Sequence, residues 1–101
     1  MLFVVIGDAK PDVTLEQIRA NRRAFLVWER ESGLGDRCQT LARYEVVGQS
    51  PKRTFWIMRA DDPQVIHDLL EFFGDVWNVQ AFPVIERSLV DVTRAVKVRS
   101  D

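Results

Sequence analysis

The chain has 101 residues, of which 47% are hydrophobic and 29% are charged, and its net charge is −1 at pH 7. This length fits one domain with a sizeable core, and the balanced charge gives no basic surface for nucleic acid or anionic lipid. A single cysteine, Cys38, and a single histidine, His67, exclude an internal disulfide framework and leave too few ligands for a zinc site. The apolar run of residues 1–6 is too short for a signal peptide or a membrane span. We therefore expect a cytoplasmic protein with no metal, nucleic-acid or membrane partner.

The first two predicted elements are a strand and a long helix. The strand occupies residues 1–9, before a proline. Thr14 offers an N-cap, and Gln17 three residues later completes the pattern of a capping box. This pattern predicts a helix over residues 15–32 that ends at the glycines following it.

The middle of the chain predicts a β-hairpin followed by a second helix. The hairpin strands occupy residues 41–48 and 53–60, with a short turn between them. Asp62 then provides a helix cap and Pro63 the first helical position, which favours a helix over residues 63–73 with a glycine stop.

The last predicted strand lies within residues 77–87, and Pro83 favours an edge position for it, where a missing N–H is tolerated. The order β-α-β-β-α-β predicts a ferredoxin-like α+β fold with a four-stranded antiparallel sheet. We assign this domain to residues 1–87. Residues 88–101 follow a fold that is already complete and are apolar for a chain end, so we predict an arm that packs on a partner subunit.

The predicted strands are apolar on both faces. Residues 1–6 and 55–58 do not alternate with polar residues, a pattern typical of sheets buried on both sides. Two helices can cover one face of a four-stranded sheet, and a second copy of the chain is the simplest cover for the other. The sequence therefore predicts a homodimer or a higher homo-oligomer, with Trp28, outside the apolar stripe of the first helix, as a candidate contact.

The first helix carries two charged residues, Arg22 and Glu29, within an apolar stripe formed by Leu15, Ile18, Phe25 and Leu26. Charges directed toward a core are unfavourable unless they are paired or face a polar cavity. One interpretation is that both side chains reach around the helix edge, or pair with strand residues such as Arg43 or Glu45. The other is that Arg22 anchors an anionic substrate while Glu29 acts as a general acid or base.

Further candidates are His67 and three aromatic residues. His67 lies opposite the apolar stripe of the second helix, with Glu71 one turn later, which favours a surface ion pair. It becomes a candidate catalytic base if a partner subunit covers that face. Tyr44, Trp56 and Trp77 either line a pocket for a planar ligand or pack in the core or in an interface.

Residues 1–5 (MLFVV), 17–21 (QIRAN) and 65–70 (VIHDLL) form three segments that together carry a resemblance to a known family. They resemble segments of muconolactone delta-isomerases, which belong to the dimeric α+β barrel superfamily. Residues 1–5 (MLFVV) resemble the start of that family. Residues 17–21 (QIRAN) are similar to Gln-Leu-Lys-Ala-Asp on its first helix, and residues 65–70 (VIHDLL) resemble Ala-Leu-His-Asp-x-Leu on its second helix. The resemblance implies a dimeric α+β barrel with isomerase activity.

The chain also departs from that family at polar positions. Val4 and Ile6 stand where the family has histidine and lysine on its first strand, and Arg22 stands where it has an acidic residue. If the family's acid–base chemistry depends on these positions, this chain cannot perform it unchanged.

Two main hypotheses of function follow. The first is a small cofactor-free enzyme of isomerase or cyclase type that shifts a proton on a lactone- or quinone-like ring. In it, Arg22 binds the substrate, Glu29 and His67 are the catalytic candidates, and the three aromatic residues shape the cavity. The alternative is a non-enzymatic homodimer that binds a small molecule or serves as an assembly module. A third possibility within the superfamily is cofactor-free oxygenation or haem handling, and the placement of His67 on a polar face argues against haem.

Overall fold

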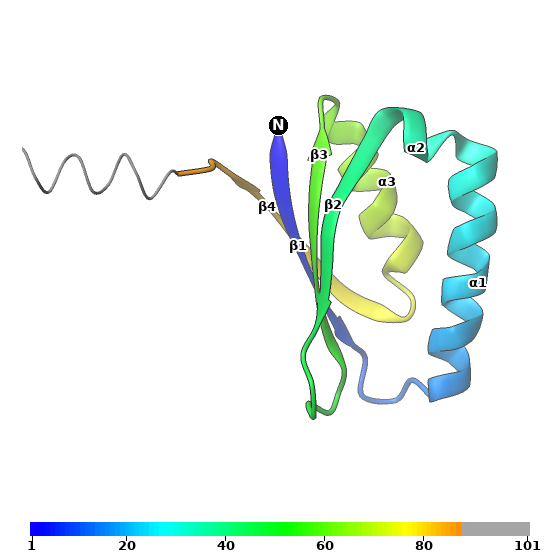
Figure 1. Cartoon of the computed structure of the whole chain (residues 1–101). Helices are drawn as coiled ribbons and strands as arrows, with labels where there is room; N and C mark the ends of the chain where they lie inside the picture. The colour runs from blue at the N-terminus through cyan, green and yellow to red at the C-terminus, as the bar shows by residue number, and fades with distance from the viewer. Residues whose placement is uncertain (88–101) are drawn as a thin grey trace, which may run out of the picture.

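A computed structural model of the chain describes residues 1–87 and confirms the predicted ferredoxin-like α+β fold. The elements are β1 (Leu2–Ala9), α1 (Leu15–Ser32), α2 (Leu34–Arg37), β2 (Cys38–Glu45), β3 (Arg53–Ala60), α3 (Pro63–Phe73) and β4 (Trp77–Val84). The four strands form an antiparallel sheet in the order β2-β3-β1-β4, with β4, which contains Pro83, at an edge as predicted. The helices α1 and α3 stand on one side of this sheet (Figure 1). The predicted arm, residues 88–101, lies outside the described residues.

Both helix starts follow from local sequence. The Thr14 hydroxyl accepts a hydrogen bond from the Gln17 backbone N–H at 3.1 Å, and the Thr14 N–H donates to the Gln17 side chain at 2.8 Å. This capping box satisfies two donors that the first turn of α1 leaves unpaired. The helix ends at Gly33, whose φ of 69° lies in the left-handed region that glycine adopts without strain.

The second strand begins three residues earlier than predicted, at Cys38 rather than at residue 41. The cause is the short helix α2, which the sequence analysis did not predict. Leu34 at its start is buried in the core and holds this turn against the sheet. The chain therefore enters β2 directly after Arg37. A register shift between Thr40 and Ala42 then marks a bulge in the pairing of β2 with β3.

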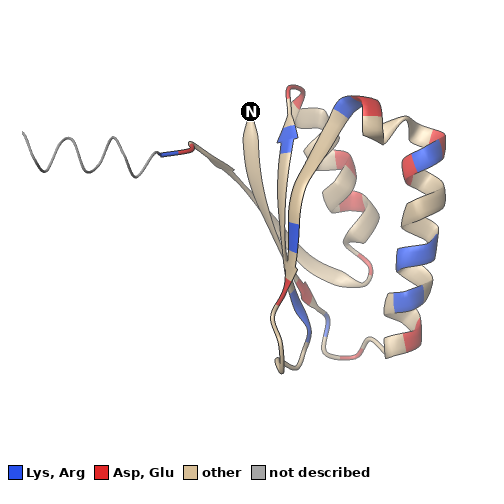
Figure 2. Ribbon diagram, viewed as in Figure 1, with Lys and Arg blue, Asp and Glu red and all other residues tan. Residues whose placement is uncertain are grey.

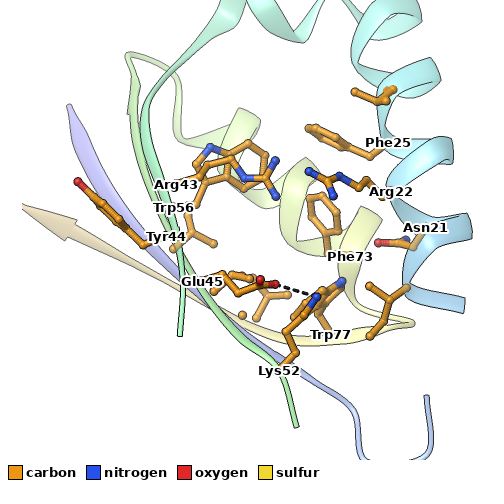
Figure 3. Close-up of a pocket in the computed structure, with 16 residues that line it drawn as sticks. Asn21, Arg22, Phe25, Arg43, Tyr44, Glu45, Lys52, Trp56, Phe73 and Trp77 are labelled. Carbon is orange, nitrogen blue, oxygen red and sulfur yellow. Dashed lines mark ion pairs between the residues drawn. The ribbon is translucent and has the colours of Figure 1, made fainter. Parts of the chain in front are cut away.

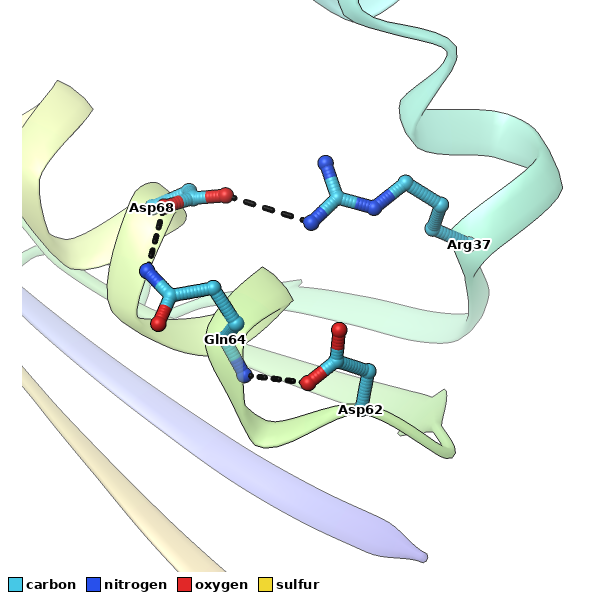
Figure 4. Close-up of polar contacts among 4 residues, drawn as sticks. All are labelled: Arg37, Asp62, Gln64 and Asp68. Atoms are coloured by element: carbon cyan, nitrogen blue, oxygen red, sulfur yellow. Dashed lines mark hydrogen bonds and ion pairs between the residues drawn. The ribbon is translucent and has the colours of Figure 1, made fainter.

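A polar cluster joins α2 to α3 (Figure 4). Arg37 Nη2 lies 3.3 Å from Asp68 Oδ2, and the Gln64 side-chain amide donates to Asp68 Oδ1 at 3.0 Å. The hydrogen bond from Gln64, and then the interactions with Arg37, lower the pKa of the Asp68 carboxyl. Asp62 caps α3 by accepting a 2.9 Å hydrogen bond from the Gln64 backbone N–H.

The core lies between the sheet and α3, with α1 attached through aromatic side chains. The buried residues of the core are Phe3, Val5, Phe25, Leu34, Trp56, Met58, Ala60, Val65, Ile66 and Leu69. Trp28, predicted as a candidate dimer contact, is partly buried, and its indole stacks on the Phe72 ring of α3 at 4.9 Å.

The other face of the sheet carries no helix among the described residues (Figure 1). Cross-strand neighbours on this face include Val4 with Ile57 and Ile6 with Phe55, and all four are partly exposed. The centre of this outer face is apolar, since β1 carries no charge before Asp8 (Figure 2). Asp8 itself forms a bidentate ion pair with Arg53, with distances of 2.6 and 3.0 Å. The inference from the sequence that two helices cover one face is thus confirmed. Within residues 1–87, no helix is long and apolar enough to cross a membrane.

Candidate functional site

A pocket of about 510 Å³ lies between α1 and the helix-facing side of the sheet (Figure 3). Its inner walls are mainly apolar and aromatic, and its outer part carries polar and charged groups, a combination common in small-molecule sites. The lining residues are Val5, Gly7, Ile18, Asn21, Arg22, Phe25, Leu26, Arg43, Tyr44, Glu45, Lys52, Thr54, Trp56, Phe73, Trp77 and Val79.

Aromatic rings hold the inner wall in place. The Phe25 ring lies 5.5 Å from the Trp56 ring in an edge-on arrangement and 5.0 Å from the Phe73 ring. Such offset geometries are the favourable ones for aromatic pairs. The Trp56 indole N–H donates to the Thr40 hydroxyl at 2.9 Å, which fixes the orientation of this ring. These contacts hold the rings at an angle to one another, so the wall is a preorganised apolar surface built from several aromatic rings.

Gly7 makes room for the second tryptophan of the pocket. A Cβ at this position would lie 3.3 Å from the Thr54 hydroxyl oxygen and 3.5 Å from Cε3 of Trp77. Glycine in a strand interior weakens the strand but permits close approach of a neighbouring group. Here it lets the Trp77 ring lie against the backbone of β1.

Two arginines face each other across the pocket (Figure 3). Arg22 extends from α1, Arg43 extends from β2, and their guanidinium groups point toward one another. The Arg43 guanidinium carbon lies 5.2 Å from the Trp56 ring centroid, within the range of a cation–π interaction. In the described part of the chain, neither arginine forms an ion pair with a carboxylate.

The carboxylate of the pocket belongs to Glu45, and no other described lining residue is acidic. Its Oε1 lies 2.8 Å from Nζ of Lys52, across the β2–β3 hairpin (Figure 3). Both side chains are partly exposed. An acceptor and a donor of protons thus stand side by side at the edge of an apolar cavity.

The structure brings three of the predicted site residues together, because Arg22, Trp56 and Trp77 line the pocket. Tyr44 also belongs to the lining, but its ring points to the other side of the sheet (Figure 3). It pairs there with Phe55 and is 63% exposed.

The two predicted catalytic residues lie outside this pocket. Glu29 is half-buried on α1, two turns or roughly 10 Å beyond Arg22. The pocket ends before that level because Phe25 and Trp28 pack against α3 there. His67 lies on the exposed face of α3, with its Nε2 at 3.1 Å from Oε1 of Glu71, which confirms the predicted i,i+4 pair.

Sequence reasoning missed Arg43, Glu45 and Lys52 as pocket residues. Arg43 and Glu45 are two positions apart on a strand, and such residues share one face of a sheet. That spacing could have indicated a charged patch facing α1. In residues 1–87 no group of three or more histidine, cysteine or acidic side chains is arranged to hold a metal ion.

Comparison with known proteins places this fold in a wider group. A family described as Domain of unknown function (DUF3303) matches residues 1–97. The chain belongs to this family. It has no match among the curated proteins.

Several solved structures share the fold of this DUF3303 protein. The first is 5-chloro-2-hydroxyhydroquinone dehydrochlorinase (TftG) from Burkholderia phenoliruptrix AC1100, in complex with 2,5-dihydroxybenzoquinone. It has a TM-score of 0.62 at 17% identity and covers 86% of this chain and 96% of its own. A protein from Streptomyces coelicolor A3(2) has a TM-score of 0.52 at 10% identity, and the match covers 87% of this chain and 100% of that protein. A structure described as an antibiotic biosynthesis monooxygenase from Deinococcus radiodurans has a TM-score of 0.50 at 14% identity, and the match covers 87% of this chain and 96% of that protein. At these identities the likeness shows the fold.

Proposed function

We propose that this DUF3303 protein is a small enzyme of isomerase or cyclase type that shifts a proton on a lactone- or quinone-like ring. The observation that carries this proposal is the pocket, which combines an aromatic wall, two arginines and one carboxylate within about 510 Å³. A proton shift needs an acid–base group and stabilisation of the developing charge, and both are side-chain functions that require no cofactor. The dehydrochlorinase that shares the fold is bound to a quinone, which supports a ring compound as the substrate.

The proposed mechanism assigns the proton transfer to Glu45. A general base must come within hydrogen-bond distance of the proton that it removes, and Glu45 is the acidic residue of the described pocket lining. In the mechanism its carboxylate takes a proton from a ring carbon. The electron pair of that C–H bond moves onto a conjugated carbonyl oxygen, and Arg22 stabilises the resulting enolate. Return of the proton to a different carbon completes the shift. Glu45 thereby takes the role that the sequence analysis gave to Glu29.

We also propose that the protein acts as a homodimer formed through the outer face of the sheet. This face carries partly or fully exposed apolar side chains such as Val4, Ile57 and Phe82. Within residues 1–87 no helix covers them. Contiguous exposed apolar surface usually marks an interface, and a two-fold axis lets one patch cover its own copy. Replacing Ile57 by lysine is expected to produce a monomer in analytical ultracentrifugation. Val47→Lys is the control, because Val47 is 96% exposed at the hairpin turn. A variant Ile57→Lys that keeps the wild-type mass would contradict this interface.

The proposed activity is tested by deuterium exchange into ring C–H positions. Muconolactone and 2,5-dihydroxybenzoquinone are incubated with the protein in D₂O, and the loss of ring proton signals is followed by NMR. We expect faster exchange for at least one of the two compounds, and slower exchange again with Glu45→Gln. Binding of both compounds without faster exchange would refute the enzyme and leave the alternative, a homodimeric small-molecule-binding or assembly module.

A further inference from the structure

The two arginines of the pocket differ in their surroundings from a neighbouring arginine on the same helix. Arg23, next to Arg22 in sequence, forms an ion pair with Glu16 at 3.0 Å on the solvent side of α1. Arg22 and Arg43 converge on the pocket from two different elements (Figure 3), and neither forms an ion pair with a carboxylate of the described residues. Two guanidinium groups that face each other repel. A negatively charged group bound between them attracts both and outweighs their mutual repulsion.

The surroundings of the arginine pair also indicate the shape of an anion that would fit between the two guanidinium groups. The Trp56 ring lies under the Arg43 guanidinium and is held by its bond to Thr40. The Phe73 ring lies 5.9 Å from the Trp56 ring. The two rings stand at a steep angle to each other, and a planar ligand in the pocket beside them can direct an in-plane substituent toward the arginines. The planar guanidinium fork is well suited to bind an oxyanion through paired N–H donors.

We infer that the pocket binds a planar ring compound bearing an oxyanion, which Arg22 and Arg43 clamp from opposite sides. The inference rests on the proposed function for the location of the reaction, and it adds the charge of the substrate and a second binding residue, Arg43. The oxyanion is either a ring enolate or a carboxylate on the ring. The pair Glu45–Lys52 lies on the hairpin side of the same pocket. A ring clamped in this way therefore presents its carbon atoms to Glu45.

The first test compares charged and neutral probes on the wild-type protein by titration calorimetry. The probes are 2,5-dihydroxybenzoquinone, which is ionised at neutral pH, its uncharged dimethyl ether 2,5-dimethoxybenzoquinone, and benzoate. We expect one of the anions to bind at least about tenfold more tightly than the neutral ether, as for hydrogen bonds to charged groups, and to weaken as salt is added. Tighter binding of dihydroxybenzoquinone assigns the clamp to a ring oxygen, and tighter binding of benzoate assigns it to a carboxylate. Equal affinity for all three probes would overturn the inference.

The second test removes each arginine in turn. Arg22→Met and Arg43→Met are each expected to weaken binding of the preferred anion by roughly ten- to a hundredfold, and to leave the affinity for the neutral ether nearly unchanged. Arg23→Met, on the same helix but outside the pocket, is the matched control and is expected to bind like the wild type. Loss of anion affinity in Arg23→Met as large as in Arg22→Met would contradict a specific clamp.

Two further measurements separate binding from folding and from catalysis. Thermal midpoints of all variants show whether Arg43→Met has lost its fold, and Arg43→Lys, which keeps the charge, is expected to recover part of the affinity. An anion preference that persists without ring-proton exchange refutes the enzyme but not the clamp. Exchange on a neutral ring that is insensitive to Arg43→Met refutes the clamp but not the enzyme.

Discussion

Phe25 is the buried side chain of α1, and its removal provides the sharpest test of the packing. It is 6% exposed, and its ring centroid lies between 5.0 and 6.0 Å from those of four other aromatic residues. Its partners are Trp28, Trp56, Phe72 and Phe73. They belong to α1, β3 and α3, so one ring connects two helices and the sheet.

The expected loss for Phe25→Ala follows from these contacts. Truncation of a buried phenylalanine to alanine costs about 3–5 kcal/mol, including the cavity left behind. Favourable aromatic pairs add about 0.5–1.5 kcal/mol each beyond the buried area, and four pairs are lost here. These pair contributions are already part of the total loss measured on truncation, so we expect a decrease in the free energy of unfolding near the upper end of that range, about 4–5 kcal/mol.

Urea denaturation followed by circular dichroism measures this change. Val27→Ala is the control on the same helix, because Val27 is 53% exposed and such a surface substitution is expected to change stability by no more than about 0.5 kcal/mol. A loss below about 1 kcal/mol for Phe25→Ala would show that α1 is held by other contacts, and would refute the account of the pocket wall.

Three further predictions concern individual charged groups. Glu45→Gln is expected to slow ring-proton exchange, measured by NMR, by about 10²- to 10⁴-fold. Glu29→Gln, outside the pocket, is expected to leave the rate unchanged. A slower rate in Glu29→Gln with an unchanged rate in Glu45→Gln would identify Glu29 as the base. The hydrogen bond and charge of Arg53 lower the pKa of Asp8 in the folded protein. The ionised Asp8 carboxylate therefore stabilises the fold at pH values above the pKa that Asp8 has in the unfolded chain. This stabilisation is lost as the pH falls through the lower pKa that Asp8 has in the folded protein. Urea midpoints between pH 7 and pH 3 are expected to fall less steeply for Asp8→Asn than for the wild type, and identical slopes would show that the pair carries no pH dependence. His67→Ala removes the exposed contact of His67 with Glu71 and is expected to change stability by less than about 1 kcal/mol without affecting exchange. An inactive variant would contradict the placement of the site.

The helix starts could be predicted because their determinants are local. Thr14 and Gln17 bond each other, and Asp62 accepts from the Gln64 backbone N–H beside Pro63 at the first helical position. Both patterns are visible in the sequence. The helix α2 could not be predicted in the same way. Its single turn depends on burial of Leu34 in the core, which is a tertiary contact.

The candidate site was predictable only in part, for two physical reasons. The shift in register between Thr40 and Ala42 sets which β2 side chains face α1, and it turns Tyr44 outward and Arg43 inward. The extent of the pocket along α1 depends on the aromatic contacts of Phe25, and these leave Glu29 beyond its end. Arg22 could be recognised because a charge in an apolar stripe is conspicuous in the sequence itself.

The measurement that tests the central claim most directly is an NMR titration of the three indole N–H groups of the ¹⁵N-labelled protein with 2,5-dihydroxybenzoquinone. Trp56 and Trp77 line the pocket, whereas Trp28 packs on Phe72 outside it, so the chain contains its own control. The account predicts saturable shifts of the Trp56 and Trp77 signals, with the Trp28 signal the least affected. Shifts confined to Trp28, or no shift of any indole at a saturating concentration, would contradict a ring-binding site between α1 and the sheet.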